Sequence, residues 1–174
     1  MSNLFELAKK RRSVRKYTSE SIDDKVIQNI VNVALIAPSS WGRHPVEFLV
    51  VKDKEMIEKI AKCKRMGAAP LENATVAIVV FADIKDCELW IEDSSVASTY
   101  ILLAAEEQGI GACWIHIRNR AGQKTTADEE IRELLNIPNN YSVLNVVALG
   151  QKGEIKQARS ENDLHKENIH YEKY

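Results

Sequence analysis

The sequence predicts a single domain with a layered core of helices and strands. Its 174 residues, 45% of them hydrophobic, can bury one core of useful size but leave little for a second. Residues 75–82 are apolar at odd and even positions alike, which predicts a central strand covered on both faces. Around this strand, stretches of helical period alternate with shorter β-branched stretches, as layered domains require.

The expected elements, in chain order, are a short helix from residue 4, a helix over 23–36, a strand over 46–52, a helix after residue 53, a strand over 75–82, a helix over 91–108, a strand over 112–117, a helix over 127–135 and a strand over 142–149. Apolar spacing of three or four residues identifies the helices, and β-branched or aromatic composition identifies the strands. Residues after 149 carry few apolar side chains and are expected to form an arm.

Polar side chains mark the starts of the first two helices. Either Ser2 or Asn3 can cap the first helix. Ser21, with Asp24 three residues later, resembles a capping arrangement for the second helix.

Similar signals mark three later helix ends. Asp53 and Thr126 can each cap the helix that follows, and Glu129 stands three residues after Thr126. Gly109 fits the position just after the long helix, where the backbone is commonly left-handed.

Composition disfavours several classes of protein. Lys plus Arg number 24 and Asp plus Glu 25, so the net charge of -1 gives no general field for nucleic acid. The longest apolar run is far shorter than the roughly 20 residues of a transmembrane helix, and no signal-peptide core precedes the N-terminal cations. Three widely spaced cysteines fit neither a disulfide framework nor a zinc motif. We therefore expect a cytoplasmic protein with no metal, membrane or nucleic-acid partner.

Two segments are candidate binding sites. Residues 11–16 place four cations and a hydroxyl at the end of a helix, which suits a phosphate clamp but equally suits solvated charges that stabilise the helix dipole. The loop over 37–45 contains two serines, a glycine and a tryptophan that could fit a planar ligand, although the same residues make an ordinary helix stop and turn.

Motifs of protein-borne catalysis are missing from the sequence. The run Gly109-Ile110-Gly111 follows a helix and enters a strand, the reverse of a dinucleotide-binding turn. No Walker loop, G-x-S-x-G or H-E-x-x-H occurs. Since His116 and Cys113 lie in a predicted strand, core packing is their more common role. This pattern favours an enzyme whose cofactor performs the reaction.

Four segments in the same order resemble the FMN-dependent nitroreductase family, in its short single-domain form. They are residues 11–17, 37–40, 109–115 and 148–152, and the ending over 170–174 is similar as well. The resemblance implies an α+β fold in which helices flank a mixed sheet, and a homodimer whose chains interlock with the flavin sites at the interface. Residues 1–150 would form the flavin-binding domain, and residues 151–174 a C-terminal extension exchanged with the partner.

The resemblance also implies cofactor contacts from both subunits. Arg11 and Lys152 would face the phosphate and Arg15 the polar edge of the ring, while residues 38–40 of the other subunit would contact the ring. The implied cofactor-binding set is Arg11, Arg12, Ser13, Arg15, Pro38, Ser39, Ser40, Gly42, Trp114, Ile115, His116, Gly150 and Lys152.

Two departures from the family pattern stand out. Many relatives carry Asn-x-Gln-Pro where this chain reads Gly42-Arg43-His44-Pro45, and the usual Gly-Tyr-Pro turn is replaced by residues 150–152. We hypothesise that Arg43 or His44 compensates for the missing ring contact, or lines the substrate pocket with Trp41 and favours anionic acceptors.

The function implied by the resemblance is an FMN-dependent NAD(P)H oxidoreductase. Electrons would pass from NADH or NADPH to the flavin and then, in a second step, to a nitroaromatic, a quinone or another electron-poor small molecule. No protein side chain is assigned as catalytic. The alternatives are a non-catalytic flavin, nucleotide or anion-binding protein, and a specialised flavin enzyme such as a reductive dehalogenase.

Overall fold

A computed structural model describes residues 3–85 and 87–174. The helices and strands are α1 (Leu4–Lys10), α2 (Asp24–Leu35), β1 (Val46–Val51), α3 (Lys54–Lys62), β2 (Val76–Asp83), α4 (Trp90–Glu107), β3 (Ile110–His116), α5 (Ala127–Leu135) and β4 (Tyr141–Gln151). Short 3₁₀ turns are η1 (Ser40–Gly42), η2 (Ala69–Leu71), η3 (Glu161–Asp163) and η4 (Lys166–Asn168). The predicted order of elements is confirmed.

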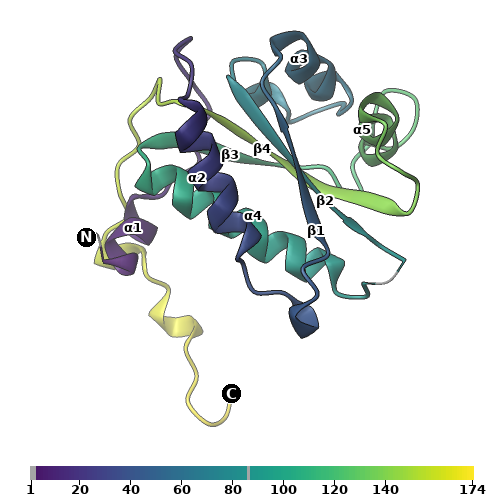
Figure 1. The fold of residues 1–174 in the computed structure, drawn as a ribbon. Helices are drawn as coiled ribbons and strands as arrows, with labels where there is room; N and C mark the ends of the chain where they lie inside the picture. The colour runs from purple at the N-terminus through teal and green to yellow at the C-terminus, as the bar shows by residue number, and fades with distance from the viewer. Residues whose placement is uncertain (1–2, 86) are drawn as a thin grey trace.

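The four strands form one sheet in the order β1-β2-β4-β3, with every neighbouring pair antiparallel. Helices α2 and α4 cover one face, while α3 and α5 cover the other (Figure 1). The α+β class is therefore confirmed. The resemblance implies a mixed sheet, but the named strands pair only in the antiparallel sense. Within the described residues, the parallel pairing is an isolated bridge between Ser13 and Ala112.

Strand β2 runs through the middle of the sheet and is buried on both faces. Val76, Ile78 and Val80 pack toward α2 and α4. Ala77 and Val79 pack toward α3 and α5. Because strand side chains alternate between faces, an uninterrupted apolar run is what a doubly covered strand needs, and the central-strand prediction is confirmed.

The helix caps match the sequence prediction except at α2. Asn3 caps α1 by accepting from the Phe5 N–H, and the alternative cap, Ser2, lies outside the described residues. At α2 the Ser21 prediction is wrong, because Asp23 immediately precedes the helix and accepts from the Lys25 N–H at 2.8 Å.

The other predicted caps are confirmed. Asp53 accepts from the Met56 N–H, and Thr126 forms a capping box with Glu129. Gly109 has φ +76°, which a residue without Cβ adopts at little cost.

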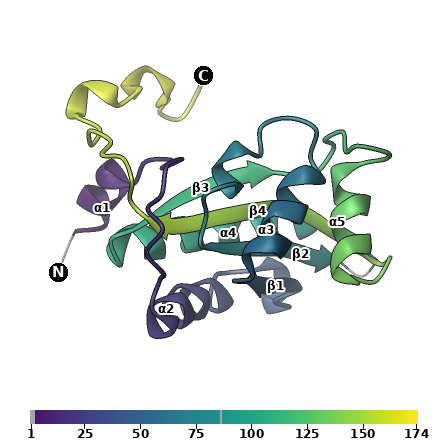
Figure 2. The ribbon, with the colours of Figure 1, turned by 90° about the horizontal axis from the view of Figure 1, so that it is seen from above.

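Strand β4 extends to Gln151, two residues beyond the predicted strand end. The sheet therefore includes the first residue of the predicted C-terminal extension. The chain then leaves the sheet, follows α1 with a bond from the Arg159 N–H to the Lys9 carbonyl, and projects away from the body of the domain (Figure 2).

Candidate functional site

The segment over residues 11–17 lies against the end of the sheet where β3 begins and β4 ends. The Val14 N–H donates to the Ala112 carbonyl at 3.0 Å, next to the Ser13–Ala112 bridge. Farther along, Tyr17 pairs with Lys152. This pairing fixes the backbone from which the predicted cations project.

Two glycines allow this close approach. A Cβ built on Gly111 would come within 2.9 Å of a Val14 methyl carbon, and one built on Gly150 within 2.6 Å of the Tyr17 side chain. Both distances are too short for non-bonded carbons. Gly150, predicted as a cofactor contact, therefore has a definite packing role that positions the cationic segment.

The arginines of this segment lack acidic partners. Among the described residues, no carboxylate lies within 4.0 Å of the guanidinium of Arg11, Arg12 or Arg15. Arg12 instead donates to the Gln157 carbonyl, and burial, followed by nearby Arg159, lowers the pKa of Arg11. The Glu154 carboxylate accepts from the Arg15 backbone N–H at 2.7 Å, but the three guanidinium groups form no ion pair in the described part of the chain and are suited to an anionic ligand.

Lys152 differs from the arginines because its ammonium lies 2.8 Å from both carboxylate oxygens of Glu106 on α4. A small cavity of about 160 Å³ lies beside this pair. Its charged lining residues are Lys10, Arg12, Glu106, Lys152 and Lys156. Lys156 pairs with Glu154 at 2.8 Å, as Lys152 does with Glu106. Lys10 and Arg12 form no ion pair among the described residues, so they leave this cavity positive, as a phosphate site requires.

Strand β3 is an edge strand that pairs only with β4 among the named strands. The Ala112 carbonyl points outward to Val14, and backbone polar groups alternate in direction along a strand. The N–H and C=O groups of Trp114 and His116 therefore also point outward. No described strand pairs with this part of the edge, so these donors and acceptors can meet a flat heterocycle.

The side chains of the predicted Trp114–His116 segment separate into two groups. The Trp114 and His116 rings stack on the same face at 6.4 Å between centroids, with 14° between their planes. Ile115 is 1% exposed and belongs to the core between the sheet, α3 and α5. The open backbone edge thus comes from Trp114 and His116 and not from Ile115.

The predicted ring-binding loop over 37–45 has an unusual backbone. Trp41, Gly42 and His44 all have positive φ, at +56°, +63° and +47°. For residues other than glycine this conformation costs on the order of 1–3 kcal/mol, and it clusters at functional sites. Trp41 is also 90% exposed, which leaves a large aromatic ring without a place in this chain's core.

Asp93 on α4 anchors this loop. One carboxylate oxygen accepts from both the N–H and the hydroxyl of Ser40, each at 2.9 Å, and the Cys87 thiol lies 3.7 Å from the other oxygen. Asp93 is 4% exposed, so its hydrogen bonds are shielded from water. Sequence reasoning missed this residue, because an acid in the first turn of a helix is usually a solvated charge that favours the dipole.

The loop and the cationic segment lie at opposite ends of α4 (Figure 1). Asp93 contacts the loop, whereas Glu106, thirteen residues later, pairs with Lys152. At 1.5 Å per residue these anchors are about 20 Å apart. A single chain therefore presents two separate parts of the predicted site.

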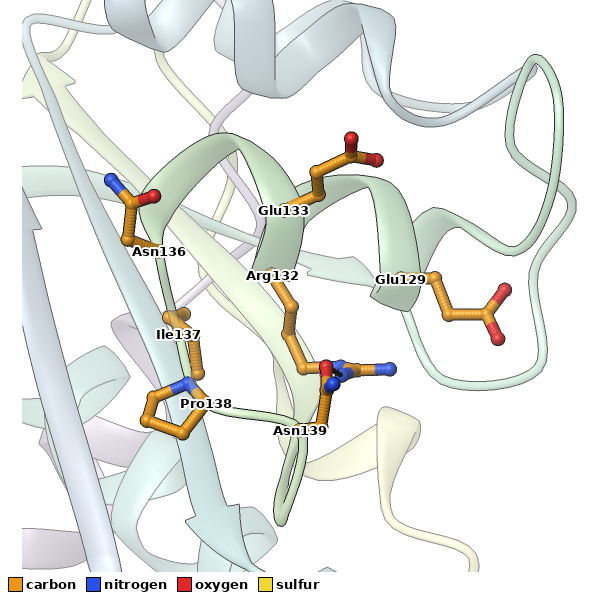
Figure 3. Close-up of a pocket in the computed structure, with 7 residues that line it drawn as sticks. All are labelled: Glu129, Arg132, Glu133, Asn136, Ile137, Pro138 and Asn139. Atoms are coloured by element: carbon orange, nitrogen blue, oxygen red, sulfur yellow. Dashed lines mark hydrogen bonds between the residues drawn. The ribbon is translucent and has the colours of Figure 1, made fainter.

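A cavity of about 750 Å³ lies at the C-terminal end of α5 and includes no predicted site residue. Figure 3 shows Arg132 and Asn139 side by side, with Glu129 and Glu133 pointing elsewhere. Arg132 donates to Asn139 at 3.0 Å and lies 3.4 Å from Asp128. Its charge is already partnered, and nothing here converges on a ligand.

The three cysteines are free and buried, and burial raises the pKa of each thiol. Among the described residues, no His, Cys, Asp or Glu side chains gather in a group that could hold a metal ion. No helix in the described ranges is both long enough and apolar enough to cross a bilayer.

Comparison with known proteins identifies the family of this chain. The model of the Nitroreductase family matches residues 8–89 and 62–151. The chain belongs to the nitroreductase family. A protein from Archaeoglobus fulgidus, named for NADH dehydrogenase and NAD(P)H nitroreductase activity, is 36% identical over the full length of both chains. The predicted family and the prediction of an oxidoreductase enzyme are confirmed.

Two further relatives bear on the fold and on the alternatives. The structure of an FMN-dependent nitroreductase from Clostridium difficile R20291 superposes with a TM-score of 0.95 at 40% identity, covering 98% of this chain and 99% of that one. An iodotyrosine deiodinase from Thermotoga neapolitana is 25% identical over 94% of this chain and 96% of its own.

Proposed function

We propose that this protein is a cytoplasmic FMN-dependent NAD(P)H oxidoreductase that reduces nitroaromatics, quinones or other electron-poor small molecules. One observation carries the proposal: arginines whose guanidinium groups form no ion pair among the described residues lie beside an open strand edge, so phosphate-binding charge and ring-binding backbone groups adjoin. The 40% identical C. difficile protein, named as FMN-dependent, supports the choice of flavin.

The residues present suit both the phosphate and the ring of FMN. Arg11, Arg12 and the positive cavity beside Lys152 suit the phosphate. Arg15 suits the polar edge of the ring, where a cation stabilises negative charge when the ring is reduced. The outward backbone groups of Trp114 and His116 can donate to and accept from the ring's heteroatoms. Bound FMN would supply the two-electron chemistry, accepting hydride from nicotinamide and then reducing the acceptor.

We further propose that a second copy of the chain completes the site. The loop over 37–45 lies about 20 Å from the anchor of the cationic segment along α4, so one flavin ring would take its loop contacts from the partner. Three exposed apolar side chains near the loop fit an interface: Leu35, Ile36 and Trp41. Trp41, Arg43 and His44 would then line the substrate pocket, and residues 151–174 would pack on the partner as a C-terminal extension.

The direct test is an absorption spectrum. The protein is incubated with excess FMN, desalted and mixed anaerobically with NADH or NADPH. Retained flavin absorbance that bleaches with nicotinamide, and returns when an acceptor is added after removal of the donor, is the expected result. Flavin that is retained but not bleached would favour the non-catalytic binding protein, and no retained flavin would refute the proposal.

The relation to an iodotyrosine deiodinase supports reductive dehalogenation as a second candidate. The assay is halide release from a halogenated tyrosine by the reduced holoprotein. Release faster than turnover of nitroaromatic acceptors would make dehalogenation the better assignment.

A further inference from the structure

A second group of cations, none of which has a role in the proposed flavin site, lies at the far end of β3. Arg118 and Arg120 follow the strand directly, and Lys64 follows α3. The Arg65 N–H donates to the Ala121 carbonyl at 3.0 Å, which ties the segment after α3 to the segment after β3 at this edge of the sheet. In Figure 2 the ends of α3 and β3 lie near each other. Together with His116, these residues are called the β3 rim: Lys64, His116, Arg118 and Arg120.

The rim is held in a defined shape. The Arg120 N–H donates to the Ile117 carbonyl, and the Arg120 carbonyl accepts from the Ala127 N–H, so the turn after β3 is tied at both ends. The Arg118 guanidinium carbon lies 6.0 Å from the centroid of the Trp90 ring, a cation–π distance. The Trp90 contact orients the Arg118 side chain, and the backbone bonds fix the position from which the Arg120 side chain projects.

The rim concentrates positive charge without neutralising it. Within residues 3–85 and 87–174, no carboxylate lies within 4.0 Å of the cationic groups of Lys64, Arg118 or Arg120. Burial lowers the pKa of His116, and the neighbouring rim cations lower it further. Burial, followed by Arg120, likewise lowers the pKa of Lys64. Mutually repelling cations kept together in this way are suited to an anion.

The rim adjoins the open strand edge but lies apart from the cationic segment over 11–17. His116 is four residues beyond Ala112, the partner of that segment, which is about 13 Å along a strand. An anion on the rim would thus be attached to a molecule lying next to the edge formed by Trp114 and His116. Since the proposed flavin ring occupies that edge, the molecule carrying the anion would lie beside the ring, where the substrate reacts.

Resting on the proposed function, we propose that the β3 rim binds an anionic oxygen group of the substrate, a phosphate or a carboxylate, and so selects anionic substrates. Two sources share this chemistry: the phosphates of the nicotinamide donor and a carboxylate on the acceptor. The rim is distinct from Arg43, the residue for which the sequence alone predicts the same preference.

The test compares matched anionic and neutral substrates on the FMN-loaded protein. The acceptor pair is para-nitrobenzoate and nitrobenzene, and the donor pair is NADPH and N-benzyl dihydronicotinamide, which has no phosphate. The variants are Arg118→Gln and Arg120→Gln, with exposed Lys59→Gln as a control that removes one charge elsewhere. Since Arg118→Gln also loses its contact with Trp90, exposed Arg120→Gln provides the independent test.

Each rim variant is expected to lower kcat/KM for the anionic member of one pair by about three- to fivefold, the effect of one partly exposed ion pair, with the neutral member unchanged. Loss in the donor pair identifies a phosphate, and loss in the acceptor pair a carboxylate. High salt should shrink the wild-type preference, because exposed charges are screened. Lys59→Gln should change neither ratio.

Three results would overturn the proposal. Unchanged ratios in both rim variants would exclude the rim, and a shift with Arg43→Gln alone would assign the selection to the loop over 37–45. Loss of FMN absorbance in the rim variants would mean that the rim holds flavin. Failure of the wild-type protein to retain FMN is a different outcome, since it refutes the proposed function itself.

Discussion

Removing the Asp93 carboxylate should release the loop over 37–45. Asp93 is buried and accepts two hydrogen bonds from Ser40, while the Cys87 thiol lies near its second oxygen. The loop keeps two non-glycine residues at positive φ, so it depends on such anchors to stay in this conformation. Asp93→Ala removes the anchor, and Asp93→Asn keeps an acceptor oxygen but removes the charge.

The expected cost follows from the lost bonds. Hydrogen bonds to a charged group stabilise the folded state by about 1.5–3 kcal/mol each. The variant also avoids the cost of burying a charged carboxylate, and this offsets part of the loss. We therefore expect Asp93→Ala to lower the free energy of unfolding by about 3 kcal/mol and Asp93→Asn by about half as much. For a chain of this length, about 3 kcal/mol corresponds to a fall in Tm of about 6–12 °C.

The assay is thermal and urea unfolding of both variants beside Glu92→Gln. Glu92 is an exposed acid in the same helical turn, so this control removes an equal charge near the helix N-terminus without touching Ser40. Pairing Asp93→Ala with Ser40→Ala should show a coupling of about 1 kcal/mol. If Asp93→Ala is no more destabilising than Glu92→Gln, the anchoring argument is wrong.

Three other outcomes are expected. Arg15→Ala should weaken FMN retention and slow flavin reduction by nicotinamide, because a cation that favours negative charge on the ring is lost; unchanged values of both would exclude that role. Gly150→Ala should lower the free energy of unfolding by about 1–3 kcal/mol in urea titration, because its Cβ would overlap Tyr17. Iodoacetamide at neutral pH should leave the three buried thiols of the native protein unmodified, since burial raises their pKa, to about 11 for Cys63; labelling as fast as in urea would contradict this.

Local signals predicted the elements of this fold well. The apolar run of β2, the Thr126 capping box and the left-handed Gly109 each follow from neighbouring residues and are confirmed. The prediction of Ser21 as the cap was wrong because Asp23 offers an equivalent acceptor two residues nearer the helix. Residue spacing alone does not decide which of two possible acceptors caps a helix.

The candidate site was harder to predict, because it depends on pairings between distant segments. The contact of Ser13 with Ala112 and the anchoring of Ser40 by Asp93 join residues far apart in the sequence. The ion pair between Lys152 and Glu106 also joins residues far apart in the sequence. It reduces the net positive charge at Lys152, a residue predicted to bind the phosphate. Which β3 residues present backbone groups outward depends on how β3 pairs with β4. Trp114 and His116 do so, and Ile115 does not.

The separation of the two half-sites along α4 leads to a sharp test of the proposed dimer. In a two-fold symmetric dimer each flavin would take Arg15 from one protomer and the loop anchored by Asp93 from the other. A mixed dimer of an Arg15→Ala chain and an Asp93→Ala chain would then combine both defects in one site and leave the other site intact. After random exchange, half of the dimers are mixed, so about a quarter of all sites should regain wild-type FMN binding. Each variant incubated with itself is the control. No recovery, from two variants that exchange subunits and are each impaired alone, would mean that both groups serve the same protomer's flavin.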